Sequence, residues 1–146
     1  KTQLWQESCR VPLMVKVPGV TPNNKKSMGV VNLIDMYPTL LDLCGLPENP
    51  ENEGRSFADL IRNPDMDWSE PTLSDYGYGG HRIYDGRYSY IVFSSKGTEE
   101  LYDHQVDPME WYNLVSNPEY AEVKARLKSY VPSERESESP LNQPSI

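Results

Sequence analysis

The sequence has no uninterrupted apolar run long enough to cross a bilayer, which argues against a transmembrane helix. It also has no excess of basic residues, because 14 Lys and Arg stand against 22 Asp and Glu, giving a net charge of −8. The basic side chains are dispersed along the chain, so we do not expect a surface that binds nucleic-acid phosphates. An anionic ligand would need local cations to overcome the general negative field.

Cysteine and apolar residues are scarce as well. Cys9 and Cys44 are the only cysteines, so one disulfide at most can form, and their spacing neither establishes the pair nor identifies the redox compartment. Hydrophobic residues make up 37% of the chain and the mean hydropathy is −0.68. Both values are low for a self-sufficient globule of 146 residues, so we expect a modest core.

The first third of the chain predicts a strand followed by a helix. Residues 12–17 are mostly apolar and stop at Pro18, which favours a buried strand, and residues 29–34 look extended. Because residues 1–45 cannot bury both faces of such a strand, we expect them to complete a larger sheet supplied by other sequence. The chain begins with Lys rather than Met, and we expect upstream sequence to precede it.

The predicted helix begins at Asp35, whose side chain can cap it, and Pro38 falls in its first turn. Gly45 ends the apolar run, and Cys44 just before it is interpreted as a small core residue. Residues 46–71 are rich in Pro, Glu and Asn and predict a linker containing one short helix capped by Ser56.

The second half predicts an antiparallel meander. Asp85-Gly86 lies between two β-rich runs and is a strong hairpin signal, because both residues tolerate a positive φ. The expected strands cover residues 72–76, 81–84, 87–93 and 99–102.

A helix is predicted from Asn117-Pro118 onward. Its apolar stripe should pack on the sheet, and residues 133–146 have the polar composition of a disordered tail. The stripe consists of Tyr120, Val123, Leu127 and Tyr130. The predicted fold class is therefore α+β. The expected segments are residues 1–45, 46–71, 72–132 and 133–146.

Residues 100–114 carry the most informative spacing in the chain, ELYDHQVDPMEWYNL. Asp103 and Asp107 can each begin a turn by accepting backbone N–H bonds, and Pro108 fixes one φ between them. A well-ordered surface loop explains this stretch better than a catalytic site, and we expect His104 within it to make a structural hydrogen bond.

Three further motifs stand in order before this one: KTQLWQESCRVPL at residues 1–13, NLIDMYPTLLDLCGL at residues 32–46 and EGRSF at residues 53–57. Together the four motifs resemble the C-terminal portion of type I sulfatases of the alkaline phosphatase superfamily, in an iduronate-sulfatase-like form. The resemblance covers roughly residues 1 to 115. It implies a sulfatase that acts on sulfated carbohydrates and works in the periplasm or outside the cell.

The resemblance places Lys1 on an active-site lysine, and we interpret it as the catalytic residue of this chain. A compact ammonium with three donors suits a sulfate oxygen as negative charge builds there during S–O cleavage. Gln6 stands where the family pattern leads us to expect Glu, which puts charge pairing at that position in doubt.

The resemblance also implies a formylglycine nucleophile, made from a Cys/Ser-x-Pro/Ala-x-Arg motif, and a Ca²⁺ site. Cys9 does not match this motif, since Val11 and Leu13 occupy the Pro/Ala and Arg positions. Carboxylates are scattered along loops, so we predict no metal ligand and no cofactor in this chain. We expect both groups in a missing N-terminal catalytic portion, and we predict that this piece alone is inactive.

The segment at residues 76–82, YGYGGHR, is the best candidate for substrate contact besides Lys1. Its glycines allow close backbone approach, Tyr78 offers a flat face to a sugar ring, and His81 and Arg82 can donate to anionic oxygens. A plain strand connection is an equally good interpretation. The three tryptophans are interpreted as packing residues, with Trp68 the one expected to be partly exposed.

Two other functions stay open at this point. The chain could belong to a related phosphomonoester or phosphodiester hydrolase, which would carry a Thr or Ser nucleophile upstream. It could instead be a stand-alone module that binds a protein partner through a sheet edge or its acidic tail.

Overall fold

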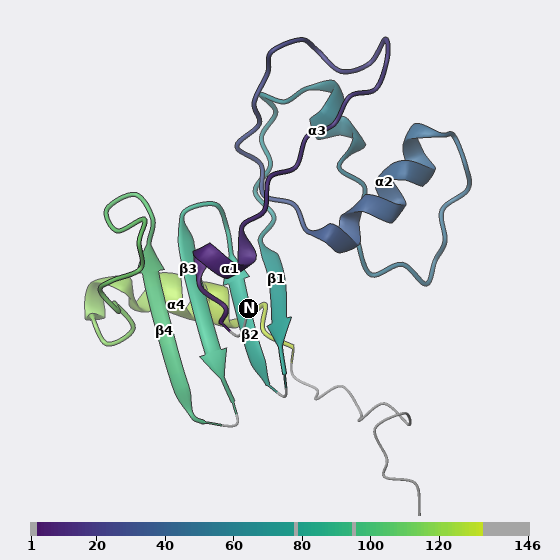
Figure 1. The fold of residues 1–146 in the computed structure, drawn as a ribbon. Coiled ribbons are helices and arrows are strands. Elements are labelled where there is room, and N and C mark those ends of the chain that lie inside the picture. Colours follow the sequence, from purple (N-terminus) through teal and green to yellow (C-terminus); the bar gives the residue numbers. More distant parts are fainter. Residues whose placement is uncertain (1–2, 78, 95, 133–146) are drawn as a thin grey trace, which may run out of the picture.

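A computed structural model describes residues 3–77, 79–94 and 96–132 of the chain. A four-stranded sheet lies between a short helix, α1 (Gln6–Cys9), on one face and α4 (Ala121–Lys128) on the other, and a second lobe extends from one end of the sheet (Figure 1). Lys1, Tyr78 and the predicted tail at residues 133–146 lie outside the described residues.

The sheet is an antiparallel meander with the order β1-β2-β3-β4. Its strands are β1 (Thr72–Tyr76), β2 (Gly80–Tyr84), β3 (Tyr88–Phe93) and β4 (Thr98–Asp103). The predicted hairpin between β2 and β3 is confirmed, because Asp85 Oδ1 accepts the backbone N–H groups of Arg87 (2.9 Å) and Tyr88 (2.6 Å). Gly86 adopts the positive φ that this turn requires, +97°.

Side chains alternate between the two faces of the sheet, so each face has its own core. On the α4 face, Ile83, Tyr90 and Leu101 pack with Leu127 of α4, and each is 0 or 1% exposed. On the α1 face, the next residues along the strands, Ile91 and Tyr102, pack with Leu4 just before α1. The sheet is thus covered by segments from both ends of the described chain.

Helix α4 follows a single 3-10 turn, η2 (Pro118–Tyr120), at the predicted position. The Asn117 side chain accepts the Glu119 backbone N–H (3.0 Å) and caps the start. Leu127, Val123 and Tyr120 pack on the sheet as predicted, whereas Tyr130 lies beyond the last helical turn and is 47% exposed. Its assignment to the packed stripe was wrong because the helix ends first, at Lys128.

Glu99 of β4 joins the sheet to α4. Its carboxylate binds Lys124 Nζ (2.5 Å) and Lys128 Nζ (2.7 Å), and it accepts the Tyr90 hydroxyl (2.9 Å). The bonds from Lys124 and Lys128 lower the pKa of Glu99 from 4.5 to about 2, although partial burial opposes them. The three partners therefore stabilise the ionised form of Glu99 in the folded state.

We expect acid to weaken the attachment of α4. A carboxylate with a lowered pKa contributes stability that is fully present above pH 4.5 and is lost as the pH falls through about 2. Glu99→Gln should therefore flatten the fall in unfolding free energy between pH 5 and 2.5, while Glu119→Gln, at an exposed site, should leave it unchanged. Urea unfolding at a series of pH values measures this, and parallel curves for Glu99→Gln and wild type would contradict it.

The second lobe contains η1 (Leu33–Asp35), α2 (Met36–Leu43) and α3 (Ala58–Arg62). Phe57, Leu60 and Ile61 form its small core. Ser56 was predicted to cap α3, but the N-cap residue is Phe57, which makes no side-chain cap bond. Ser56 lies one residue earlier, where its Oγ accepts the Ala58 backbone N–H (3.1 Å). Asp35 is the N-cap residue of α2 as predicted, but its side chain makes no capping bond to that helix.

Two of the sequence motifs meet in this lobe. Asp35 Oδ1 accepts the Arg55 backbone N–H (3.0 Å), and Thr39 Oγ1 accepts the Phe57 backbone N–H (3.0 Å). Gly54 lies so close to the Ile34 carbonyl that an added Cβ would stand 2.3 Å from its oxygen. Residues 32–46 and 53–57 are therefore two halves of one contact, and this explains their spacing.

Residues 12–17 do not form the predicted buried strand. The backbone there belongs to no sheet, and Leu13, Met14 and Val15 are 41, 92 and 40% exposed. A strand needs a neighbour for its backbone groups, and the meander offers none to this segment, which leads away from the sheet. Residues 29–32 belong to no strand, and the run ends in η1.

Cys44 was expected in the core but is exposed, because it lies at the open end of α2. Cys9 is half-buried and the two cysteines are unpaired.

The predicted α+β class, with a small antiparallel sheet packed by a C-terminal helix, is confirmed. The segment boundaries remain predictions. Within the described ranges, no helix is long and apolar enough to span a bilayer.

Candidate functional site

The α1 face of the sheet holds the main polar cluster of the described chain. Arg82 of β2 is 4% exposed, and its guanidinium donates from Nε to Ser89 Oγ (2.9 Å) and from Nη2 to Gln6 Oε1 (2.6 Å). Its Nη2 also lies 3.9 Å from Glu110 Oε1. Three partners on three separate segments therefore converge on one buried cation.

Arg82 was predicted to contact substrate, and the structure places it beneath α1 instead of on an open rim. In this arrangement Arg82 would reach a substrate only if Gln6 moved aside. The neutral amide of Gln6 accepts a hydrogen bond from Arg82, as a carboxylate at this position could. The departure from the expected Glu thus removes a charge but keeps the contact.

His81 lies elsewhere. It precedes Arg82 on β2, so its side chain points to the opposite face of the sheet. Its Nδ1 bonds to Asp75 Oδ1 (2.6 Å) on the paired strand β1, where Asp75 and His81 are direct register partners. The structure therefore does not bring His81 and Arg82 together on one ligand-binding surface.

His81 is 16% exposed and Asp75 is 54% exposed, close to the glycine turn that joins β1 and β2. Gly77 and Gly79 in this turn have φ values of +57° and +77°, which explains the glycines by backbone geometry. Tyr78 stands between them, outside the described residues. Contact of His81, Arg82 and Tyr78 with substrate remains a prediction.

The loop after β4 is built as the spacing of residues 100–114 predicts. Asp103 is 1% exposed and binds Arg87 through both oxygens, with Nε 2.9 Å from Oδ1 and Nη2 2.7 Å from Oδ2. It also accepts the Gln105 backbone N–H (3.0 Å), while Asp107 accepts that of Tyr112 (2.8 Å). The bonds from Arg87 lower the pKa of Asp103, against the effect of burial. These aspartates are structural.

Asn113 closes the same loop onto the sheet. Its Oδ1 accepts the backbone N–H groups of Leu101 (3.0 Å) and Val115 (3.0 Å). The predicted structural bond of His104 is confirmed, since its Nε2 lies 2.9 Å from Glu110 Oε1. Trp111 in this loop was expected to pack, but it is 73% exposed.

Glu110 is the residue that sequence reasoning missed. Its side chain is 3% exposed, and its Oε2 accepts the Gln6 backbone N–H at 2.7 Å. Burial raises the pKa of Glu110, but the bonds from His104 and Gln6 and the charge of Arg82 outweigh it, so the pKa is lowered. The one available signal was its fixed place in the motif, three residues after Asp107.

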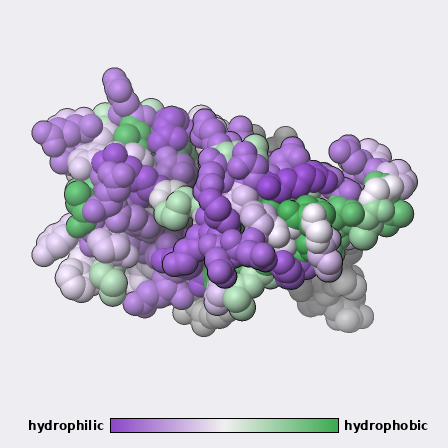
Figure 2. All heavy atoms as spheres, turned by 90° about the horizontal axis from the view of Figure 1, so that it is seen from above, coloured by the Kyte–Doolittle hydropathy of each residue, from purple (hydrophilic) through white to green (hydrophobic). Residues whose placement is uncertain are grey.

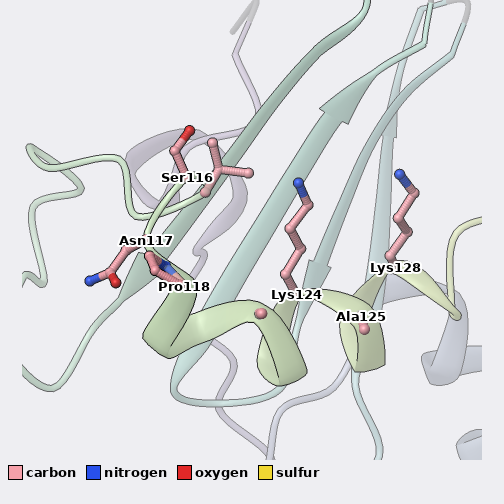
Figure 3. A pocket seen from close by; sticks show the side chains of 8 residues that line it. Ser116, Asn117, Pro118, Lys124, Ala125 and Lys128 are labelled. Atoms are coloured by element: carbon pink, nitrogen blue, oxygen red, sulfur yellow. The ribbon is translucent and has the colours of Figure 1, made fainter.

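A shallow hollow of about 410 Å³ lies beside α4, lined by Val115, Ser116, Asn117, Pro118, Ala121, Lys124, Ala125 and Lys128 (Figure 3). Its two lysines share the single carboxylate of Glu99, which offsets one of their two positive charges within the chain. The hollow contains none of the predicted site residues, and we assign it no function.

The sulfatase resemblance implies Ca²⁺ and a formylglycine. Among the described residues, no group of three or more His, Cys, Asp and Glu side chains could hold a metal ion. Cys9 Sγ donates to the Leu4 carbonyl (3.3 Å) inside the α1 segment, in a structural role. The described residues do not supply the donor set, and no chemical step is assigned to them through either group.

A family model for the C-terminal region of N-sulphoglucosamine sulphohydrolase matches residues 1–137. The chain belongs to this sulfatase C-terminal family. A sulfatase of Formosa agariphila is 32% identical over 132 residues, which covers 90% of this chain and 26% of the relative. The Delta 4,5-hexuronate-2-O-sulfatase of Bacteroides thetaiotaomicron is 31% identical over 141 residues, covering 87% of this chain and 29% of the relative.

A solved 2-O GAG sulfatase superposes with a TM-score of 0.55 at 30% identity, covering 65% of this chain and 22% of that structure. The chain spans a little more than a quarter of the length of the two curated relatives. The comparisons confirm the resemblance to the C-terminal portion of sulfatases.

Proposed function

We propose that this chain is the C-terminal part of an enzyme that hydrolyses sulfate esters of carbohydrates. The family match over residues 1–137 carries the proposal. The name of one relative specifies a hexuronate 2-O-sulfate, and this supports an iduronate-like, 2-O-sulfated sugar as the substrate class. Lys1 binds a sulfate oxygen, and the hairpin with Tyr78 and His81 lies at the pocket rim.

The proposal assigns the nucleophile and the metal site to sequence before Lys1. An exposed apolar surface on the second lobe supports a missing partner of this kind. Figure 2 shows hydrophobic side chains gathered over the end of the molecule that carries α2. The exposed large hydrophobic residues of η1 and α2 are Leu33, Ile34, Met36, Tyr37 and Leu40, each at least 39% exposed. Such a surface is unusual for a free monomer and fits contact with an upstream catalytic portion.

In this arrangement the chain contributes positioning and charge. The Lys1 ammonium stabilises the negative charge that builds on a sulfate oxygen as the S–O bond breaks, an effect that grows in a water-poor site. The rim hairpin presents an imidazole, whose Nδ1 bonds to Asp75, and glycine backbone to the sugar. The two alternatives, a phosphoester hydrolase and a stand-alone binding module, become outcomes of the test.

The test uses the protein together with its upstream sequence. We expect a higher kcat/KM for 4-nitrophenyl sulfate than for 4-nitrophenyl phosphate, and release of sulfate from a 2-O-sulfated uronate disaccharide. Preference for the phosphate ester would favour the phosphoester hydrolase. No turnover of either, with a cooperative thermal melt of the isolated chain, would favour the binding module.

A further inference from the structure

We propose that Glu110 is a positioning residue for the sulfate site: it fixes the segment Leu4–Cys9, which directly follows the Lys1 region, to the C-terminal sheet. This inference rests on the proposed function only where it concerns catalysis. The attachment of α1 can be tested without any reaction.

The backbone at Glu110 is held in an unfavourable conformation. Its φ is +55°, in the left-handed region that a residue with a Cβ seldom adopts. Such a conformation persists where surrounding contacts over-determine it. Here the turn that begins at Asp107 delivers the side chain inward, since the Glu110 backbone N–H donates to the Asp107 carbonyl (3.2 Å).

Both carboxylate oxygens of Glu110 are used. Oε2 accepts the Gln6 backbone N–H, which as the first residue of α1 has no partner within the helix. Oε1 bonds to His104 Nε2 at 2.9 Å and stands 3.9 Å from Arg82 Nη2. Arg82 in turn donates to the Gln6 side chain (2.6 Å). Gln6 is therefore held through its backbone and its side chain by one buried pair of opposite charges.

Two further contacts hold the same segment against the sheet. Leu4 is 2% exposed and packs on Ile91 and Tyr102. Trp5 Nε1 donates to Glu100 Oε2 (2.8 Å). The Glu110 contact differs from these because it reaches the backbone. It therefore fixes the path of the main chain, whichever rotamer the Gln6 side chain adopts.

This path limits where Lys1 can act. Three peptide units separate Lys1 from Leu4, and at most about 3.6 Å per residue they reach about 11 Å. Fixing Leu4 and Gln6 therefore limits how far the backbone of Lys1 can lie from the sheet. A sulfate ligand must be placed within a fraction of an ångström to stabilise the reacting charge, so release of α1 should reduce turnover.

A buried ion pair is weak evidence of a role in stability, because desolvation offsets much of the attraction. Its better supported use is to select one arrangement among several. Glu110 and Arg82 fit that use, since their bonds join α1, β2, β3 and the loop after β4.

The first experiment measures attachment. In Glu110→Ala, hydrogen exchange of the Gln6 backbone amide should accelerate at least tenfold, while amides of β2 and β3 stay protected. Glu110→Gln keeps an oxygen acceptor of the same shape and should restore most of the protection. Unchanged exchange in Glu110→Ala would overturn the proposal, whatever reaction the enzyme catalyses.

The second experiment uses the enzyme with its upstream sequence. Glu110→Ala should lower kcat for a sulfate ester at least tenfold per folded molecule, with a smaller change in KM, and Glu110→Gln should recover it. Glu99→Gln, on the opposite face of the sheet, serves as the control that changes stability and leaves kcat alone.

The two failures can be told apart. If wild type cleaves sulfate esters and Glu110→Ala keeps its kcat, the positioning role is wrong. If wild type cleaves no sulfate ester, the proposed function and the catalytic half of this inference fall together, and the exchange of Gln6 still decides whether Glu110 holds α1.

Discussion

Lys1→Ala, in the enzyme joined to its upstream sequence, should lower kcat for sulfate esters by about 10²–10³-fold, the range found when one donor to a developing negative charge is removed. The mutation deletes the ammonium but leaves the nucleophile that the proposal places upstream. Steady-state kinetics with a chromogenic sulfate ester measures the effect. Lys1→Arg should recover little, because a planar guanidinium does not replace a compact point charge.

Lys26→Ala is the matched control for Lys1→Ala. Lys26 is an exposed lysine of the second lobe, and its loss makes the same change in net charge. We expect wild-type kcat from this variant. If Lys1→Ala also retained wild-type kcat, Lys1 would not bind sulfate in the transition state, and the assignment made from the family resemblance would have to be withdrawn.

Gly54→Ala should destabilise the second lobe by about 3 kcal/mol, the upper end of the usual effect of overpacking. The added Cβ would lie 2.3 Å from the Ile34 carbonyl oxygen and 2.6 Å from its carbon, and both are backbone atoms that cannot rotate away. Separating them would also pull Arg55 from Asp35 Oδ1. Denaturant unfolding followed by Trp68 fluorescence reports on this lobe, because Trp68 packs against its core.

Glu53→Ala tests whether the Gly54 effect comes from the close approach. Glu53 is the exposed neighbour of Gly54, and its truncation should change stability by less than about 0.5 kcal/mol. A Gly54→Ala variant as stable as Glu53→Ala would show that the contact between residues 32–46 and 53–57 can relax, and that the motif spacing has another cause.

Local signals in the sequence predicted the C-terminal half well, because its structure depends on neighbours in the chain. Asp85-Gly86 gives the β2–β3 turn its hydrogen bonds, and Asn117 caps the start of the last helix by itself. The turns after β4 follow from Asp103 and Asp107 in the same way. In each case the donor and the acceptor lie within five residues.

The sequence-based predictions failed where tertiary contacts, and not the local sequence, determine the structure. Residues 12–17 have the composition of a buried strand but find no neighbour among the described residues, and Cys44 is exposed for a similar reason. Contact of Arg82 with substrate stays a prediction, but its bonding partners within the chain were not foreseen: Gln6 and Glu110 lie far away in sequence. No local pattern could reveal that convergence. The positions of these residues in the chain gave no sign that they contact one another in the folded structure.

The bond between Gln6 and Glu110 joins positions 104 residues apart, whereas the meander and α4 form from neighbouring turns. Closing so long a loop is entropically unfavourable, and folding steps that depend on distant contacts are slow. The sheet with α4 should therefore assemble first, and α1 should dock as the final step. By the same reasoning α1 can detach from the sheet while the meander and α4 stay folded.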